Sequence, residues 1–178
     1  MLVAFSLTPA NQTHAEPDVI RSGHKCSVRI LADDEYFTEM MKAVADAHRE
    51  IVMAFYIFKT NGYKGNYPDR FIEGLASAVK RGVKVTVVLE RTKREDTSLD
   101  SLNRMTAHRL RKKGIDVRFD SPSVTTHVKL VVIDKRLTFV GSHNMTNSAL
   151  KYNNEVSLVI DSPDAAVEAV QYINSLCR

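Results

Sequence analysis

The pattern of hydrophobic and polar positions predicts alternating strands and helices along most of the chain. Apolar runs that alternate, or that are continuous and rich in β-branched residues, predict strands at 27–32, 51–58, 83–89, 115–119, 124–133, 137–140 and 155–160. Apolar residues at helical spacing predict helices over 33–50, 69–81, 98–113, 142–150 and from 162 to the C-terminus. This order indicates an α/β fold, for which we predict a mixed, largely parallel sheet flanked by helices on both faces.

Several boundaries have local signals of their own. Ser162 begins the last helix with a capping hydroxyl, and it is followed by a proline and an acidic residue. Asp33 or Asp34 is the expected cap of the first helix. Gly82 and Gly114 end the two helices that precede them.

The chain length of 178 residues suits one domain with a substantial core, and we assign residues 23–178 to it. Residues 1–22 are expected to be an N-terminal arm or the remnant of a signal peptide, because the apolar run at 2–7 is short and no basic residue precedes it. On this basis a periplasmic or secreted location is favoured over a cytoplasmic one.

Net charge and cysteine content exclude few classes of function. The net charge of +4 favours a polyanionic partner such as nucleic acid or anionic lipid, although a solvated surface with excess lysine explains it equally well. Cys26 and Cys177 lie near opposite ends of the chain and lack metal-binding spacing. They form either one disulfide or two free thiols.

Residues 126–144, with the sequence THVKLVVIDKRLTFVGSHN, carry the candidate chemistry. On a strand, His127 and Lys129 share one face, while Val128 and Leu130 point into the packing on the other. A lysine can hold the anionic oxygens of a phosphate, and an imidazole can attack phosphorus or transfer a proton. The pair therefore predicts a phosphate site.

The rest of this stretch supplies a turn and a polar cluster. Asp134 lies an odd number of positions from the histidine, and we expect it to brace the turn at 134–136 without touching substrate. Gly141 permits close backbone approach, and Ser142 and Asn144 supply donors for an anion, helped by the free N–H groups of any helix that starts there. His143 lies within the cluster and is a candidate for substrate contact.

Each of these residues alone is usually a packing, surface or capping residue. Together they form the pattern H-x-K-x4-D-x6-G-S-x-N, whose chance occurrence in such a chain is on the order of one in a million. The pattern resembles the HKD motif of the phospholipase D superfamily, and the chain resembles its small single-motif bacterial endonucleases. The resemblance extends over residues 27–176 and includes Glu155, which opens the last predicted strand.

The resemblance implies a mechanism and an assembly. His127 of one copy would attack phosphorus to form a phosphohistidine, and His127 of a second copy would protonate the leaving oxygen, so the chain should act as a homodimer with a shared active site. Lys129 and Asn144 of both copies would bind the phosphoryl oxygens, with Ser142 adding a hydrogen bond. Glu155 would hold the far nitrogen of the histidine ring. No metal and no cofactor is implied.

The first substrate hypothesis is an endonuclease that cleaves DNA or RNA. Three groups of basic residues are candidates for a groove along a nucleic-acid backbone, although solvated helix faces and helix C-termini explain such groups as well. The groups are Lys80, Arg81 and Lys84; Arg91, Lys93 and Arg94; and Arg104, Arg109, Arg111, Lys112 and Lys113.

The second hypothesis is a lipid phosphodiesterase of the phospholipase D or cardiolipin type. The predicted loop 59–68 contains Tyr63, Lys64 and Tyr67, which suit a membrane interface or a gate over the cleft. A third hypothesis, a non-catalytic module that binds nucleic acid, is disfavoured by the complete set of motif residues.

Overall fold

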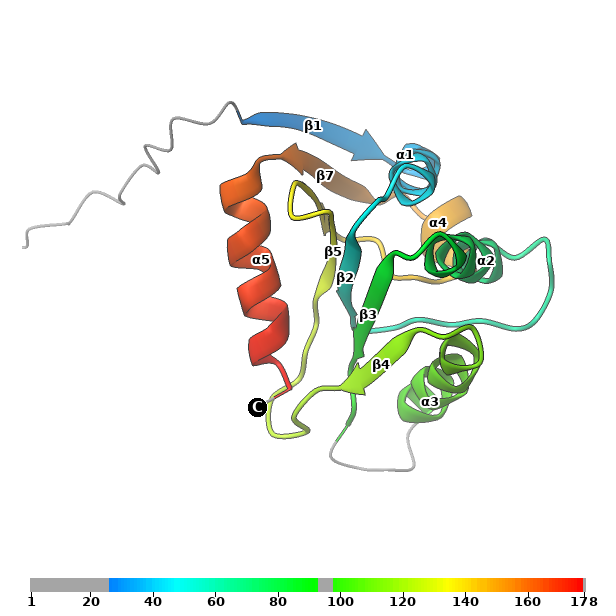
Figure 1. Cartoon of the computed structure of the whole chain (residues 1–178). Helices are drawn as coiled ribbons and strands as arrows, with labels where there is room; N and C mark the ends of the chain where they lie inside the picture. Colours follow the sequence, from blue (N-terminus) through cyan, green and yellow to red (C-terminus); the bar gives the residue numbers. More distant parts are fainter. Residues whose placement is uncertain (1–25, 93–97, 178) are drawn as a thin grey trace, which may run out of the picture.

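The computed structural model describes residues 26–92 and 98–177, which form one seven-stranded sheet with helices on both faces (Figure 1). The arm assigned to residues 1–22, and Lys93 and Arg94 of the second basic group, lie outside the described residues. The strands are β1 (Ser27–Ala32), β2 (Glu50–Phe55), β3 (Lys84–Leu89), β4 (Asp116–Phe119), β5 (Lys129–Ile133), β6 (Leu137–Gly141) and β7 (Val156–Asp161). The helices are α1 (Asp34–Ala45), α2 (Tyr67–Lys80), α3 (Ser98–Arg111), α4 (Asn147–Lys151) and α5 (Pro163–Ser175).

The sheet is mixed, as predicted, but it is not largely parallel. The strand order is β1-β7-β6-β5-β2-β3-β4, and only the β2–β3 and β3–β4 pairs are parallel. The other four neighbouring pairs are antiparallel. A parallel pair needs a crossover helix, and the C-terminal half lacks one where a tight turn joins β5 directly to β6. This turn places Asp134 and Lys135 at φ values of 53° and 52°.

Two hydrophobic clusters hold the layers together. On one face, α1, α2 and α3 cover the larger cluster, which includes Phe55, Phe71 and Val131 (Figure 1). On the other face α5 packs through Ala166 and Ile173 against a smaller cluster. The prediction of helices on both faces is confirmed.

The helix caps follow the sequence signals in one case and depart from them in another. Ser162 Oγ accepts a hydrogen bond from the Ala165 N–H at 3.4 Å, as the capping signal predicts. Asp33 occupies the N-cap position of α1, but its carboxylate makes no cap hydrogen bond there. It accepts instead from the Glu155 N–H at 2.9 Å, which ties the start of α1 to the start of β7.

Helix α1 ends at Ala45, five residues before the predicted end, and the Asp134 carboxylate accounts for the difference. That carboxylate accepts the backbone N–H groups of His48, Arg49 and Glu50 at 2.8–2.9 Å. A helix continuing through these residues would direct the same N–H groups to its own carbonyls. The bonds to Asp134 therefore free the chain to enter β2 at Glu50.

Strand β5 is also shorter than predicted, because it begins at Lys129 and not at residue 124. The Thr126 N–H donates to the Glu90 carboxylate and not to a neighbouring strand. Only the Val128 carbonyl extends the ladder, accepting from the Tyr56 N–H at 2.9 Å. His127 consequently lies just before the strand.

The two cysteines are both free and exposed, so the disulfide alternative is not realised. Within the described ranges, no helix has the length and apolar content needed to cross a membrane.

Gly141 is the last residue of β6 and lies opposite Ser157 of β7. A Cβ atom at this position would overlap Ser157 and the Val156 carbonyl of β7. We predict that Gly141→Ala lowers the free energy of unfolding by about 1–3 kcal/mol, because backbone atoms must move apart to accept the methyl group. Thermal or urea unfolding measures the loss.

Gly65→Ala is the matched control, because a Cβ atom there meets nothing within 4 Å. Equal stabilities of the two variants would contradict the steric role of Gly141.

Candidate active site

The motif residues come together at one end of the sheet. Antiparallel pairing places the start of β5, the end of β6 and the start of β7 at the same end, beside the end of β2. Lys129 begins β5 opposite Phe55, the last residue of β2. The cluster at 142–145 follows β6 and runs beside the chain after β2, where the Lys59 N–H donates to the Met145 carbonyl at 2.9 Å.

His127 and Lys129 are in direct contact. The Lys129 Nζ lies 3.2 Å from His127 Nδ1 and donates to the His127 carbonyl at 2.9 Å. His127 is exposed, whereas Lys129 is only 6% exposed. The imidazole thus faces solvent, with a cation held beneath it.

The ammonium group of Lys129 has been moved out of water. Burial lowers the pKa of Lys129, and the nearby carboxylate of Glu155 acts in the opposite direction and raises it. Without a carboxylate in contact, a partly dehydrated cation interacts more strongly with any anion that reaches it. The environment of Lys129 therefore suits the binding of a phosphate.

Tyr56 completes this group and was not recognised from the sequence. Its ring lies 4.4 Å from the His127 ring, centroid to centroid, and 5.1 Å from the Lys129 Nζ. Tyr56 follows β2 within an apolar run, and no spacing in the sequence relates it to the motif. Only the β2–β5 pairing brings it to His127.

Ser142 and Glu155 form a second group beside the first. The Ser142 hydroxyl donates to the Glu155 carboxylate, and the Ser142 N–H donates to the Val156 carbonyl at 3.0 Å. Asn144 is partly buried, and its side-chain oxygen has no hydrogen-bond partner among the described residues.

Two expectations for this site differ from the structure. The carboxylate of Glu155 bonds to Ser142 and Asn153, and not to the ring of His127. Its backbone is held by Asp33 at the start of α1, which fixes the side chain on the β7 side of the site. Glu155 therefore acts on Lys129 by charge and contacts the motif through Ser142.

His143 is not available for substrate. It is fully buried, its ring stacks on Tyr36 at 4.3 Å, and its nitrogens bond to Ser157 Oγ and to the Asp33 carbonyl at 2.7 and 2.9 Å. Burial lowers the pKa of His143, which favours the neutral ring. The sequence could not show that this position faces the core.

Several described members of the basic groups suggested by the sequence are engaged within the protein or lie away from the motif. Arg81 donates to the carbonyls of Val44 and Ala47, and Lys84 lies opposite Glu50 at the start of β2. The site is at the other end of that strand, on the order of 17 Å away.

The residues of α3 in the third group are also largely engaged in contacts within the protein. Arg109 pairs with Asp69, Lys113 pairs with Glu73, and Arg111 donates to the Val117 carbonyl. Their positive charge stabilises the packing around α3 and is not directed toward the motif.

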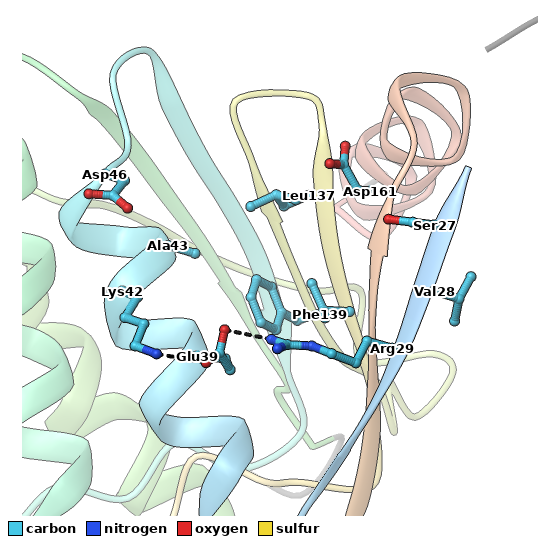
Figure 2. Close-up of a pocket in the computed structure, with 11 residues that line it drawn as sticks. Ser27, Val28, Arg29, Glu39, Lys42, Ala43, Asp46, Leu137, Phe139 and Asp161 are labelled. Atoms are coloured by element: carbon cyan, nitrogen blue, oxygen red, sulfur yellow. Dashed lines mark hydrogen bonds and ion pairs between the residues drawn. The ribbon is translucent and has the colours of Figure 1, made fainter. Parts of the chain in front are cut away.

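Five hollows of the described surface lie outside the group around His127 and Lys129. They have volumes of about 160 to 610 Å³ and are lined by none of the motif residues named above except Asp134. The one in Figure 2, of about 570 Å³, lies between α1 and the β1 side of the sheet. Its basic residues Arg29 and Lys42 both pair with Glu39, so neither cation in this hollow is without a carboxylate partner. The exposed ring of His127 lies in none of these five hollows.

The described residues contain no group of three or more His, Cys, Asp or Glu side chains arranged to hold a metal ion.

Comparison with known proteins identifies the family. The sequence pattern described as "Cardiolipin synthase, PLD-like domain" matches residues 40–177. The chain belongs to the phospholipase D superfamily. It is 33% identical to a phospholipase D of Rickettsia conorii over 99 residues, and this aligned region covers 54% of this chain and 46% of that protein. It is 35% identical to the human mitochondrial cardiolipin hydrolase over 85 residues, and this aligned region covers 48% of this chain and 31% of that protein.

The fold agrees with this membership. The structure of a phospholipase D family member, Nuc from Salmonella typhimurium, matches with a TM-score of 0.68 at 24% identity, covering 85% of this chain and 94% of that chain. This chain spans less than half of the length of each of the two curated relatives.

In this member of the phospholipase D superfamily Lys129 is buried, and burial of a cation generally costs free energy of folding. We predict that Lys129→Met leaves the free energy of unfolding unchanged or raises it by about 1–2 kcal/mol, because a thioether of similar length fills the site without a desolvated charge. Chemical unfolding at neutral pH measures the change.

Lys112→Met is the control, because Lys112 is exposed at the end of α3 and its replacement should change stability by less than about 0.5 kcal/mol. A marked loss of stability in Lys129→Met would show that the ammonium stabilises the fold.

Proposed function

We propose that the chain is a phosphodiesterase that acts through a phosphohistidine on His127. The observation that carries this proposal is the contact between an exposed imidazole and a buried ammonium, with Lys129 Nζ 3.2 Å from His127 Nδ1. A phosphate that sits over Lys129 brings its phosphorus within reach of the ring.

The active enzyme is proposed to be a homodimer. One copy supplies a single histidine, whereas in-line displacement at phosphorus needs a nucleophile on one side and a proton donor on the other. The open surface around His127 leaves room for a second copy related by a two-fold axis. Each copy would then contribute His127, Lys129 and Asn144 to one shared site.

The reaction proceeds in two displacements. A ring nitrogen of His127 forms a bond to phosphorus as the bond to the leaving oxygen breaks, and the partner's His127 gives that oxygen its proton. The partner ring then takes a proton from water, whose oxygen attacks phosphorus and breaks the P–N bond. Lys129 and Asn144 stabilise the charge that develops on the phosphoryl oxygens in both steps.

The preferred substrate class is nucleic acid, cleaved internally as by an endonuclease. Lys59 and Lys151 are exposed beside the motif, and neither pairs with a carboxylate among the described residues. Lys151 lies 5.2 Å from the ring of Tyr152, which is 69% exposed. Cations and exposed aromatic rings together suit a single-stranded backbone with splayed bases.

An anionic phospholipid is the alternative substrate, and one specific observation favours it. Val124 and Val156, which flank His127 and Glu155 in the sequence, are 75% and 54% exposed, and Tyr152 adds a third apolar surface near the site. Side chains of this kind can enter a membrane interface while lysines contact lipid phosphates.

The first test removes the proposed nucleophile. We predict that His127→Ala lowers kcat by about 10⁴-fold or more and leaves unfolding and dimer mass unchanged, because the exposed ring contributes little to packing. His108→Ala, at an exposed position on α3, should keep wild-type turnover.

Turnover is measured with excess EDTA present, and dimerisation by light scattering. Activity in purified His127→Ala, or activity that only an added divalent ion restores, would contradict the proposed mechanism. A monomer with full activity would contradict the shared site.

A second test decides the substrate class. We predict cleavage of at least one nucleic acid when single-stranded DNA, duplex DNA, RNA and cardiolipin-containing vesicles are assayed side by side, with binding that weakens steeply as salt increases. Cleavage of vesicle lipid without cleavage of any nucleic acid would establish the lipid alternative. His127→Ala serves as the blank for every substrate.

A further inference from the structure

Two buried carboxyl groups face each other next to the catalytic segment. Glu90 follows β3 and Asp120 follows β4, so adjacent parallel strands deliver them to the same end of the sheet. Each residue is only 2% exposed. Neither belongs to the motif, and the mechanism above does not use them.

Their hydrogen bonds imply a proton. Asp120 Oδ1 accepts from the Arg91 N–H at 2.7 Å, but Asp120 Oδ2 is buried without a donor if both groups are ionised. A proton on Glu90 supplies that donor. Burial raises the pKa of Glu90 to about 7, helped by its hydrogen bond to Asp120 and opposed by the bond from Thr126.

The pair holds the segment that precedes the catalytic histidine. The Glu90 carboxylate accepts the N–H of Thr126, which is the residue immediately before His127. Thr126 is itself 6% exposed. Glu90 therefore holds the backbone one residue before His127.

The Glu90 side of this arrangement is anchored to the rest of the site. Asn103 of α3 donates through Nδ2 to the Glu90 carbonyl at 3.0 Å and to the Tyr56 carbonyl at 2.8 Å, and it accepts from the Phe58 N–H at 3.0 Å. Tyr56 packs on His127 from the β2 side. The Asn103 amide thus holds the backbone of Tyr56, which packs on the His127 ring, and the backbone of Glu90, whose carboxylate holds Thr126.

Among residues 26–92 and 98–177, few charged groups lie around the pair. Asp120 is the acidic group that acts on the pKa of Glu90. The backbone N–H of Arg91 donates to Asp120 Oδ1. Beyond Asp120, the thiol of Cys177 after α5 lies close enough for Asp120, Asp116 and Arg118 to act on its pKa. From α3 the neutral amide of Asn103 faces Glu90, and the Asp100–Arg104 pair lies on the same turn.

We propose that Glu90 and Asp120 share one proton and act as a positioning pair for His127, so that removal of this proton in alkaline solution releases the segment 120–126. Two adjacent carboxylates repel each other, and Asp120 Oδ2 would be buried without a donor. The proposed effect on turnover rests on the phosphodiesterase function above, whereas the shared proton does not.

The pH dependence follows from the raised pKa of Glu90. The stabilisation is complete below the ordinary pKa of a glutamate, decreases as pH rises toward 7, and is absent above it, because the unfolded chain releases this proton earlier. The pair therefore holds the segment most firmly in acidic solution, only partly near pH 7, and not in alkaline solution.

Glu90→Gln tests the pair, because an amide places a permanent donor toward Asp120 and keeps an oxygen for the Thr126 N–H. Relative to wild type, the variant should gain stability between pH 5 and pH 8, changing the ratio of unfolding constants by on the order of tens-fold. In NMR, the Thr126 amide proton should titrate near pH 7 in wild type and stay constant in Glu90→Gln.

For turnover, Glu90→Gln should keep wild-type kcat at pH 6 and extend activity to higher pH, whereas Glu90→Ala should lose at least tenfold at every pH. Asp120→Asn restores the donor from the other side and should behave like Glu90→Gln, which keeps the test decisive if Glu90→Ala does not fold. Glu168→Gln, exposed on α5, is the matched control and should follow wild type throughout.

Parallel unfolding curves of wild type and Glu90→Gln from pH 5 to pH 8, together with a Thr126 amide that titrates in both, would overturn the shared proton. A flattened stability profile without a change in the pH profile of kcat would overturn the positioning role. If wild type cleaves no phosphodiester, the proposed function fails, while the unfolding and NMR measurements still decide the proton.

Discussion

The antiparallel pairing of β5 with β2 is the constraint on which the candidate site depends. It fixes Lys129 opposite Phe55 at the end of β2, and the ladder continues to Tyr56, whose N–H bonds to Val128. A shift of one residue would turn Lys129 toward the α5 face and Leu130 toward the site. Burial of Leu130 on the α5 side excludes that shift, so core packing selects the register that presents the lysine.

Polar groups secure both ends of β5. At its start, the Glu90 carboxylate holds the Thr126 N–H, and at its end Asp134 collects three N–H groups from the residues that lead into β2. Burial opposes ionisation of Asp134, but these donors lower its pKa overall, so the carboxylate form is the one that stabilises the turn. The motif aspartate acts at the far end of the strand and supports the site through the sheet.

The site combines rigid and unsatisfied elements. Ser142, Glu155 and Asp33 form a connected set of hydrogen bonds between the end of β6, the start of β7 and the start of α1. By contrast, the side-chain oxygen of Asn144 has no hydrogen-bond partner among the described residues, and the buried ammonium of Lys129 bonds to His127 and to no carboxylate among them. Polar groups that are already dehydrated in the free protein can interact strongly with a bound phosphate, because little further water has to be removed.

The sequence by itself determined the elements and the chemical class. Each of the seven strands overlaps a range that the apolar pattern predicted, although β5 begins five residues later than expected. The spacing of His127, Lys129, Asp134, Gly141, Ser142 and Asn144 pointed to the phospholipase D superfamily. Periodicity reports which residues are apolar and motif spacing reports which lie close in sequence, so both can be read from one chain.

Only the tertiary structure decided which strands pair and which side chains meet. The antiparallel half of the sheet, the burial of His143, the bond from Ser142 to Glu155, and the meeting of Glu90 with Asp120 all join residues distant in sequence. Such contacts depend on crossover geometry and on competition for buried hydrogen-bond partners, and local patterns carry no record of either.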